Sequence, residues 1–273
     1  MNKKLNPFDQ EKHTKILRRN RIAKNYIKYN FLKKHALKNF IYKFKSINKN
    51  FDLTLEIGTH SGELTKEISS FDNVKKSVAS DISIEMIRSV DEKGILKINF
   101  DEDRIPFKEN VFDGVFSCLY FSNSNNFSKV MLKLQKILKN KGFLLISVFG
   151  QKTLTELKKI FSETEINLLN GISPRINNFF DIKGLGDLIF SLGFANPVIE
   201  TELITVKYRS IYKLMRDLRG MGETNVMIGR RKKFDSMSFF AEAEKSYFLK
   251  SDSQEEIMAT FEIITASCWV NKK

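Results

Sequence analysis

The apolar residues of this chain follow a helical rhythm at first and a strand–helix alternation afterwards. Residues 12–46 contain neither proline nor glycine, and apolar residues recur there every three or four positions, which predicts one or two helices. Short apolar runs then alternate with amphipathic stretches. Strands are expected at 52–57, 77–80, 95–100, 111–120 and 143–149, with helices at 62–69, 84–90 and 127–138. This β-α-β-α order predicts a parallel sheet with helices on both faces.

The second half of the chain is less regular but contains the same kinds of element. Helices are expected at 153–167, 181–192, 211–218 and 238–249, and strands at 198–208 and around 261–267. Neither an internal repeat nor a long low-complexity linker is visible. We therefore divide the α/β chain into a basic helical extension, a nucleotide-binding type of core, and a C-terminal part that completes the same domain on the substrate side: residues 1–50, 51–150 and 151–273.

The net charge of +14 is concentrated at the start of the chain, where residues 1–50 hold 15 Lys and Arg against only Asp9 and Glu11. Such a segment suits an acidic partner: nucleic acid, an acidic protein face, or a membrane surface contacted peripherally. A solvated helical face is the interpretation we favour, and a cleaved presequence is a third. Nucleic acid ranks low because no aromatic RNA-binding module is recognisable.

Several classes of protein are disfavoured by composition. The longest apolar run, 143–149, is far shorter than the ~20 residues that cross a bilayer. No signal-peptide core follows the start, so we expect a cytoplasmic protein. Cys118 and Cys268 are far apart in sequence, which favours reduced thiols. No Cys/His spacing indicates zinc, so no metal is expected.

The first candidate for chemistry is a glycine turn after the first strand. That strand ends in an acid, Glu56, and the chain turns through Gly58 and Thr59 into a helix that opens near Gly62. Glycine allows positive φ and a close approach of backbone to ligand, and a helix start offers free N–H groups. The full GxGxxG pattern is absent, so this turn alone is weak evidence.

Acids also end the next two strands. Asp81 can accept hydrogen bonds from both hydroxyls of a ribose, although Asp is also a favoured helix cap. Asp101 can accept one from an adenine amino group, with Ile82 and Ile105 against the ring. Alternatively, 101–103 is a solvated acidic loop. Since the carboxyl ends of parallel strands meet at one edge, three such acids indicate one crevice.

In order and spacing, residues 55–62, 78–83, 101–107 and 112–115 resemble successive motifs of class I S-adenosylmethionine (SAM)-dependent methyltransferases. The resemblance implies a Rossmann-like, mostly parallel seven-stranded sheet and S-adenosyl-L-methionine as cofactor. It implies these cofactor-binding residues: Glu56, Gly58, Thr59, Gly62, Asp81, Ile82, Asp101 and Glu102. His60 stands where the family usually has glycine. It is a candidate base, but a tolerated substitution that narrows the pocket is the favoured interpretation.

Nearly the whole chain is similar to the mitochondrial complex I assembly factor 5 family and its bacterial relatives. The similarity rests on 8–9, 19–23, 172–174 and above all 214–225. It implies an enzyme that modifies a protein subunit of respiratory complex I, by methylation or arginine hydroxylation, in the mitochondrial matrix or at the inner face of a respiratory membrane. The related enzyme of biotin synthesis implies methylation of a carboxylate, such as malonyl-carrier protein, instead. A non-catalytic SAM-binding assembly factor is the third alternative.

Two segments are candidates for contact with the acceptor. The first is a glycine-containing loop that offers a cation, an anion and an amide; its predicted substrate-binding residues are Arg219, Gly220, Gly222, Glu223 and Asn225. A helix C-cap at Gly220 is the simpler alternative. Tyr120 and Ser122 follow the fourth strand, where Ser122-Asn123 replaces a His-Trp pair of the assembly factor. Tyr120 fits a cofactor wall better than a base, because methyl transfer mainly needs alignment with an already activated sulfonium.

Overall fold

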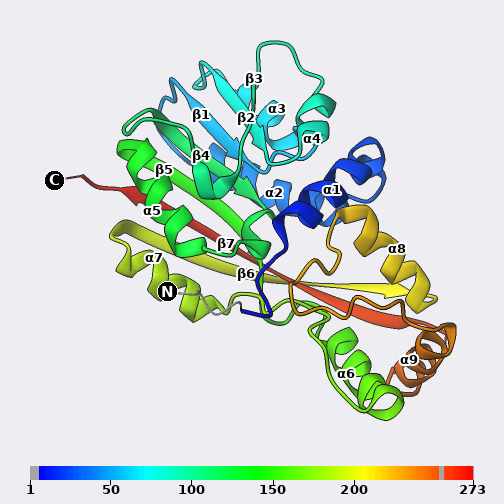
Figure 1. The fold of residues 1–273 in the computed structure, drawn as a ribbon. Coiled ribbons are helices and arrows are strands. Elements are labelled where there is room, and N and C mark those ends of the chain that lie inside the picture. Colours follow the sequence, from blue (N-terminus) through cyan, green and yellow to red (C-terminus); the bar gives the residue numbers. More distant parts are fainter. Residues whose placement is uncertain (1–5, 252–254, 273) are drawn as a thin grey trace.

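The strands form one seven-stranded sheet in the structure, a computed structural model that describes residues 6–251 and 255–272 (Figure 1). In spatial order they are β3 (Leu96–Asn99), β2 (Ser77–Asp81), β1 (Thr54–Ile57), β4 (Phe112–Cys118), β5 (Leu138–Phe149), β7 (Ile257–Val270) and β6 (Phe194–Tyr208). The first five are parallel, whereas β7 runs antiparallel to both β5 and β6. The predicted mostly parallel, seven-stranded sheet is confirmed.

The helices surround this sheet and begin with the N-terminal extension. They are α1 (Lys12–Ile22), η1 (Ala23–Lys28), α2 (Phe31–Lys45), α3 (Glu63–Ser69), α4 (Ile84–Ser89), η2 (Glu102–Arg104), η3 (Phe121–Asn123), α5 (Phe127–Ile137), α6 (Thr155–Leu169), α7 (Ile182–Ser191), α8 (Ile211–Met221) and α9 (Met237–Leu249). No helix within the described ranges is both long and apolar enough to cross a membrane.

The expected element types are present, and the boundaries differ most in the long strands. β5 begins at Leu138 and not at 143, because Leu138 already pairs with Phe112. The residues of 140–142, Asn-Lys-Gly, are typical of a turn but lie inside the strand. The turn residues remain as a local irregularity, with Lys141 at φ 58° and a shift of register between the two strands. The turn-forming residues 140–142 therefore correspond to a bulge inside β5 and do not mark the beginning of the strand.

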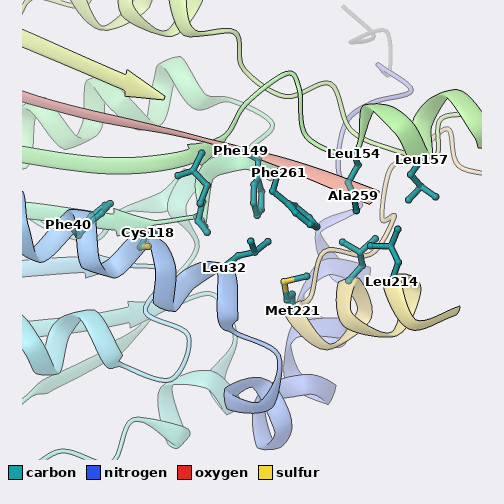
Figure 2. Packing of buried hydrophobic residues seen from close by; sticks show 14 of the residues in the cluster. Leu32, Phe40, Cys118, Phe149, Leu154, Leu157, Leu214, Met221, Ala259 and Phe261 are labelled. Carbon is teal, nitrogen blue, oxygen red and sulfur yellow. The ribbon is translucent and has the colours of Figure 1, made fainter. Parts of the chain in front are cut away.

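Side chains of β5 alternate between two hydrophobic cores. Phe143, Leu145 and Phe149 join the core covered by α2, α3, α6, α8 and α9, while Leu144 and Ile146 join the core covered by α5 and α7. Figure 2 shows part of the first core, where Leu32 and Phe40 of α2 approach the sheet and Leu214 and Met221 of α8 close one side. A strand buried on both faces explains an apolar run that only Ser147 interrupts.

The start of the described chain is tied to the segment after α8. Glu11 N donates to Val226 O (2.8 Å), and Ile228 N donates to Asp9 O (2.8 Å). From there α1 lies beside α4 and α8, and α2 packs on α3 and β4. The basic extension is thus placed next to the carboxyl ends of the first strands, where the candidate site is expected.

Candidate functional site

The structure brings three buried acids together at the strand ends. Glu56 is the penultimate residue of β1, Asp81 ends β2, and Glu102 lies just beyond β3 in η2. Glu56 Oε2 accepts hydrogen bonds from Thr59 Oγ1 and Thr65 N, both at 2.9 Å. Asp101, which we expected beside the adenine, is part-exposed and caps η2 by accepting from Asp103 N. The buried acid at the third position is therefore Glu102, and the expected convergence of acids is present.

The glycine turn is shaped by its neighbours. Gly58 has φ +76°, and its N–H donates to Ser80 O at 2.8 Å. A Cβ at Gly58 would lie 2.0 Å from Cγ of Tyr120, so only glycine lets that ring pack on the turn. Gly62, at φ +86°, precedes α3 and lies against Val90 in the same way. Both glycines are thus required by backbone and packing, independently of any ligand.

Each acid of the site is paired with a cation from the N-terminal extension. The Nζ or Nη2 to carboxylate distances are 2.6 Å for Lys12–Asp101, 3.0 Å for Lys15–Glu102, 2.6 Å for Arg19–Asp81 and 3.3 Å for Lys33–Glu56. The expectation of a solvated basic face is wrong for Lys15, Arg19 and Lys33, which are buried. Lys12, Lys15 and Arg19 recur at helical spacing, a signal that could have predicted one common face.

Asp81 has no acceptor capacity left in this arrangement. Its Oδ1 accepts from Arg19 Nε (3.2 Å) and Ser83 N (2.9 Å), and its Oδ2 accepts from Arg19 Nη2 (2.6 Å) and His60 N (3.2 Å). A carboxylate offers about four lone-pair sites. The residue predicted to hold the ribose is thus in place, but its two outward positions are filled by Arg19.

His60 is a buried structural residue in this arrangement. Its ring stacks on Tyr26 at a centroid distance of 4.8 Å. Nδ1 lies 2.6 Å from Gly58 O and 3.1 Å from Lys33 Nζ, and Nε2 lies 3.3 Å from Arg19 Nη1. Burial, together with the charges of Lys33 and Arg19, holds the pKa of His60 well below its usual range. The imidazole is therefore neutral, with both nitrogens engaged.

Tyr120 forms a wall of the site. Its hydroxyl donates to Glu102 Oε2 at 2.6 Å, and Lys15 Nζ and Arg19 Cζ lie 4.9 and 5.0 Å from its ring centroid. Burial and the neighbouring Glu102 raise the pKa of Tyr120 well above its usual value. Although burial alone would raise it, Lys15 and the Tyr120 hydroxyl lower the pKa of Glu102 to about 2. Tyr120 therefore keeps its proton, which suits a wall and not a base.

The other predicted residues near the fourth strand have local partners. Ser122 Oγ accepts from Phe149 N at 2.7 Å, so it secures the ends of two strands. Ile82 and Ile105 are buried in the same core as Tyr120, as expected for an apolar lining. Cys118 and Cys268 are free and buried. In the described part of the chain, no group of three or more His, Cys, Asp or Glu side chains is arranged to hold a metal ion.

The loop after α8 is partly structural. The helix continues through Gly220 and is capped by Gly222 at φ +84°, so a C-cap at Gly220 is wrong. A Cβ at Gly220 would lie 2.2 Å from Cγ of Tyr29. Asn225 Nδ2 donates to Pro174 O at 2.7 Å, which ties two loops together. These contacts explain why two glycines and an amide occur here.

Glu223 and Arg219 differ in their surroundings. Glu223 Oε2 accepts from Asn123 Nδ2 at 2.9 Å, and Asn123 O lies 3.4 Å from Lys15 Nζ. Glu223 therefore borders the acids of the site and the cations paired with them. Burial raises the pKa of Glu223. Arg219 is exposed on α8. Of the predicted substrate residues, the structure thus brings Glu223 to the site and leaves Arg219 at the surface.

The chemical groups at this site suit an adenosyl sulfonium, but the site is closed. The glycine turn, the ribose acceptor Asp81 and the apolar pair Ile82 and Ile105 supply the expected groups. Arg19, however, occupies the outward side of Asp81, and the Tyr120 ring lies directly on Gly58. Binding through Asp81 therefore requires Arg19 to leave its carboxylate.

Comparison with known proteins agrees with this geometry. Residues 55–146 match the family model of a methyltransferase domain. The chain is 29% identical over 269 residues to the mouse protein named arginine-hydroxylase NDUFAF5, mitochondrial, covering 97% of this chain and 78% of that protein. It is 28% identical over 177 residues to malonyl-[acyl-carrier protein] O-methyltransferase of Gallionella capsiferriformans, covering 64% of this chain and 58% of that enzyme.

Among solved structures, the YcgJ protein of Bacillus subtilis superposes with a TM-score of 0.62 at 12% identity, covering 88% of this chain and all of that chain (100%). At that identity the likeness concerns the fold. From the family match, the strand order and the acids at the strand ends, we conclude that residues 55–146 belong to a methyltransferase domain with the class I fold.

Proposed function

We propose that this chain is a SAM-dependent enzyme that modifies a protein, by methylation or arginine hydroxylation, in the assembly of respiratory complex I. The observation that carries this proposal is the 29% identity to mouse arginine-hydroxylase NDUFAF5 over 97% of the chain. The match includes the N-terminal helices and the loop after α8 as well as the methyltransferase domain. The corresponding location is the mitochondrial matrix, or the cytoplasm beside a respiratory membrane.

The cofactor would be held by groups at the ends of the first three strands. Asp81 would accept from the ribose hydroxyls, the turn at Gly58 would carry the amino-acid part, and Ile82 and Ile105 would line the adenine. When bound, SAM supplies an activated methyl group. The hydroxyl of Tyr120 remains protonated, and the face of its ring is apolar. The ring would therefore exclude water and fix the position of the reacting groups.

Glu223 is the residue best placed to meet a basic acceptor. Its carboxylate borders the site through Asn123, and its raised pKa makes it a better proton acceptor than a solvated glutamate. An arginine guanidinium could pair with it through two parallel hydrogen bonds. The loop after α8 would then select a cationic side chain.

The test is the intact mass of complex I subunits from cells with and without the gene. Methylation adds about 14 Da and hydroxylation adds about 16 Da, and a subunit should lose one of these increments when the gene is absent. Complementation with Glu223→Gln should fail to restore it, whereas Glu85→Gln, at a part-exposed acid on α4, should restore it. Identical subunit masses in the two strains would overturn the proposal.

The second candidate is methyl-ester formation on a carboxylate, such as that of malonyl-carrier protein. The similarity to the Gallionella enzyme and the exposed guanidinium of Arg219 favour it. Malonyl-carrier protein incubated with SAM and the purified chain should then gain about 14 Da, and Arg219→Gln should slow the gain. A non-catalytic SAM-binding role is the outcome if S-adenosylhomocysteine binds and neither acceptor is modified.

A further inference from the structure

We propose that α1 and η1, residues 12–28, are a movable strap that competes with the cofactor for its site, and that Arg19 sets the affinity for SAM. The inference rests on the proposed SAM binding and adds the element that regulates it.

The four acceptor positions of Asp81 are divided between the site and the strap. Two of its four acceptor positions are filled by backbone N–H groups, of Ser83 and His60, which belong to the site itself. The other two are filled by Arg19, from the strap. A ribose that donates two hydroxyls to Asp81 needs the positions that Arg19 holds. Cofactor and strap therefore exclude one another at this carboxylate.

Helices α1 and α2 are held to the domain by different contacts. The buried residues of α1 are two cations, Lys15 and Arg19. In the next helix, α2, the buried residues include the apolar Leu32, Ala36 and Phe40, which lie in the first core. Helix α1 is thus fixed chiefly by ion pairs, while α2 is anchored by hydrophobic packing. No buried residue of the two large cores belongs to the strap, although Ile16 packs at the edge of the second. Opening would uncover only a small cluster, which Ala23 and Tyr26 of η1 form with Met86 of α4.

The ion pairs of α1 become more deeply buried from Lys12 to Arg19. The outermost pair, Lys12–Asp101, has side chains 32% and 29% exposed, whereas Arg19 and Asp81 are 7% and 0% exposed. A buried carboxylate without a partner is costly. Opening is therefore unfavourable unless the ribose replaces Arg19 at Asp81. The exchange of one partner for another couples strap opening to cofactor binding.

The experiment combines calorimetry with hydrogen–deuterium exchange, using S-adenosylhomocysteine as the probe. In the wild-type chain, saturation with the probe should increase exchange of amides in residues 12–28 and leave α2 unchanged. Arg19→Gln should bind the probe at least about fivefold more tightly, a coupling of the usual size. Arg21→Gln, an exposed arginine on the same helix, is the matched control and should bind as the wild type does.

The outcomes separate the two proposals. Probe binding by the wild type with unchanged or reduced exchange in residues 12–28 would overturn the strap and leave the proposed function standing. Equal affinities of wild type and Arg19→Gln would also overturn the strap. If the wild type, Arg19→Gln and Arg21→Gln all fail to bind the probe, the proposed function fails and the strap with it. The exchange experiment needs no variant, so it tests whether the strap opens on probe binding even if Arg19→Gln does not fold.

Discussion

Helices α1 and α2 are neighbours of similar basic composition, yet they are attached to the domain in different ways. Helix α2 inserts a stripe of apolar side chains into the core and adds one buried cation, Lys33. Helix α1 buries Lys15 and Arg19 and leaves Leu17 exposed. Apolar burial is nondirectional and hard to reverse, whereas an ion pair can exchange its partner. The difference separates a structural helix from a candidate regulatory one.

The largest expected effect tests the anchoring of α2. Phe40→Ala removes a fully buried ring and should lower the free energy of unfolding by about 3–5 kcal/mol. Leu17→Ala, on the exposed side of α1, is the control and should change it by less than about 0.5 kcal/mol. Urea unfolding followed by circular dichroism measures both. Similar losses for the two variants would show that α1 and α2 are anchored alike.

The next effect concerns the innermost pair of α1. Arg19→Met leaves Asp81 buried without its cation and should cost about 3 kcal/mol, an amount typical of breaking a buried pair. Adding Asp81→Asn should recover part of the loss, because the uncompensated charge is then gone. The wild type, the two single variants and the double variant form a double-mutant cycle, which urea unfolding measures. Strictly additive losses would mean that the pair contributes nothing specific.

A smaller effect follows from the neutral imidazole under the strap. Because burial holds the pKa of folded His60 well below 6.5, the unfolded chain binds the extra proton as the pH falls. Stability present above pH 6.5 is thus lost below it, by at most about 1.4 kcal/mol between pH 7.5 and 5.5. His60→Asn should flatten this part of the pH–stability curve, whereas His13→Asn, at an exposed position, should not. An unchanged slope in His60→Asn would contradict the assignment.

The smallest effect is expected at the outer end of the cation row. Lys12→Gln breaks a part-exposed pair with Asp101 and should cost less than about 1 kcal/mol, an effect that shrinks as salt is added. Thermal unfolding at low and high ionic strength measures it. A salt-independent loss of several kcal/mol would mean that α1 is held as rigidly at its outer end as at Arg19.

Much of the fold was predictable because its signals are local. Apolar runs of strand length, helical periodicity and glycine turns predicted the order of strands and helices, and the similarity to class I methyltransferases predicted the seven-stranded arrangement. The acids after the first three strands were predictable for the same reason, since parallel strands share one carboxyl edge. Errors arose where an element depends on partners far away, as at Leu138, whose pairing with Phe112 extends β5 beyond its turn.

The amino-acid sequence by itself determined which groups can do chemistry here: the turn at Gly58, the acids Glu56 and Asp81, and the basic row of the first helix. Tertiary structure alone decided that Arg19 meets Asp81 across 62 positions of sequence and that Glu102, and not Asp101, is buried. The physical reason is that the pattern of a helix shows which residues share a face. What that face contacts depends on how the helix packs on the rest of the chain.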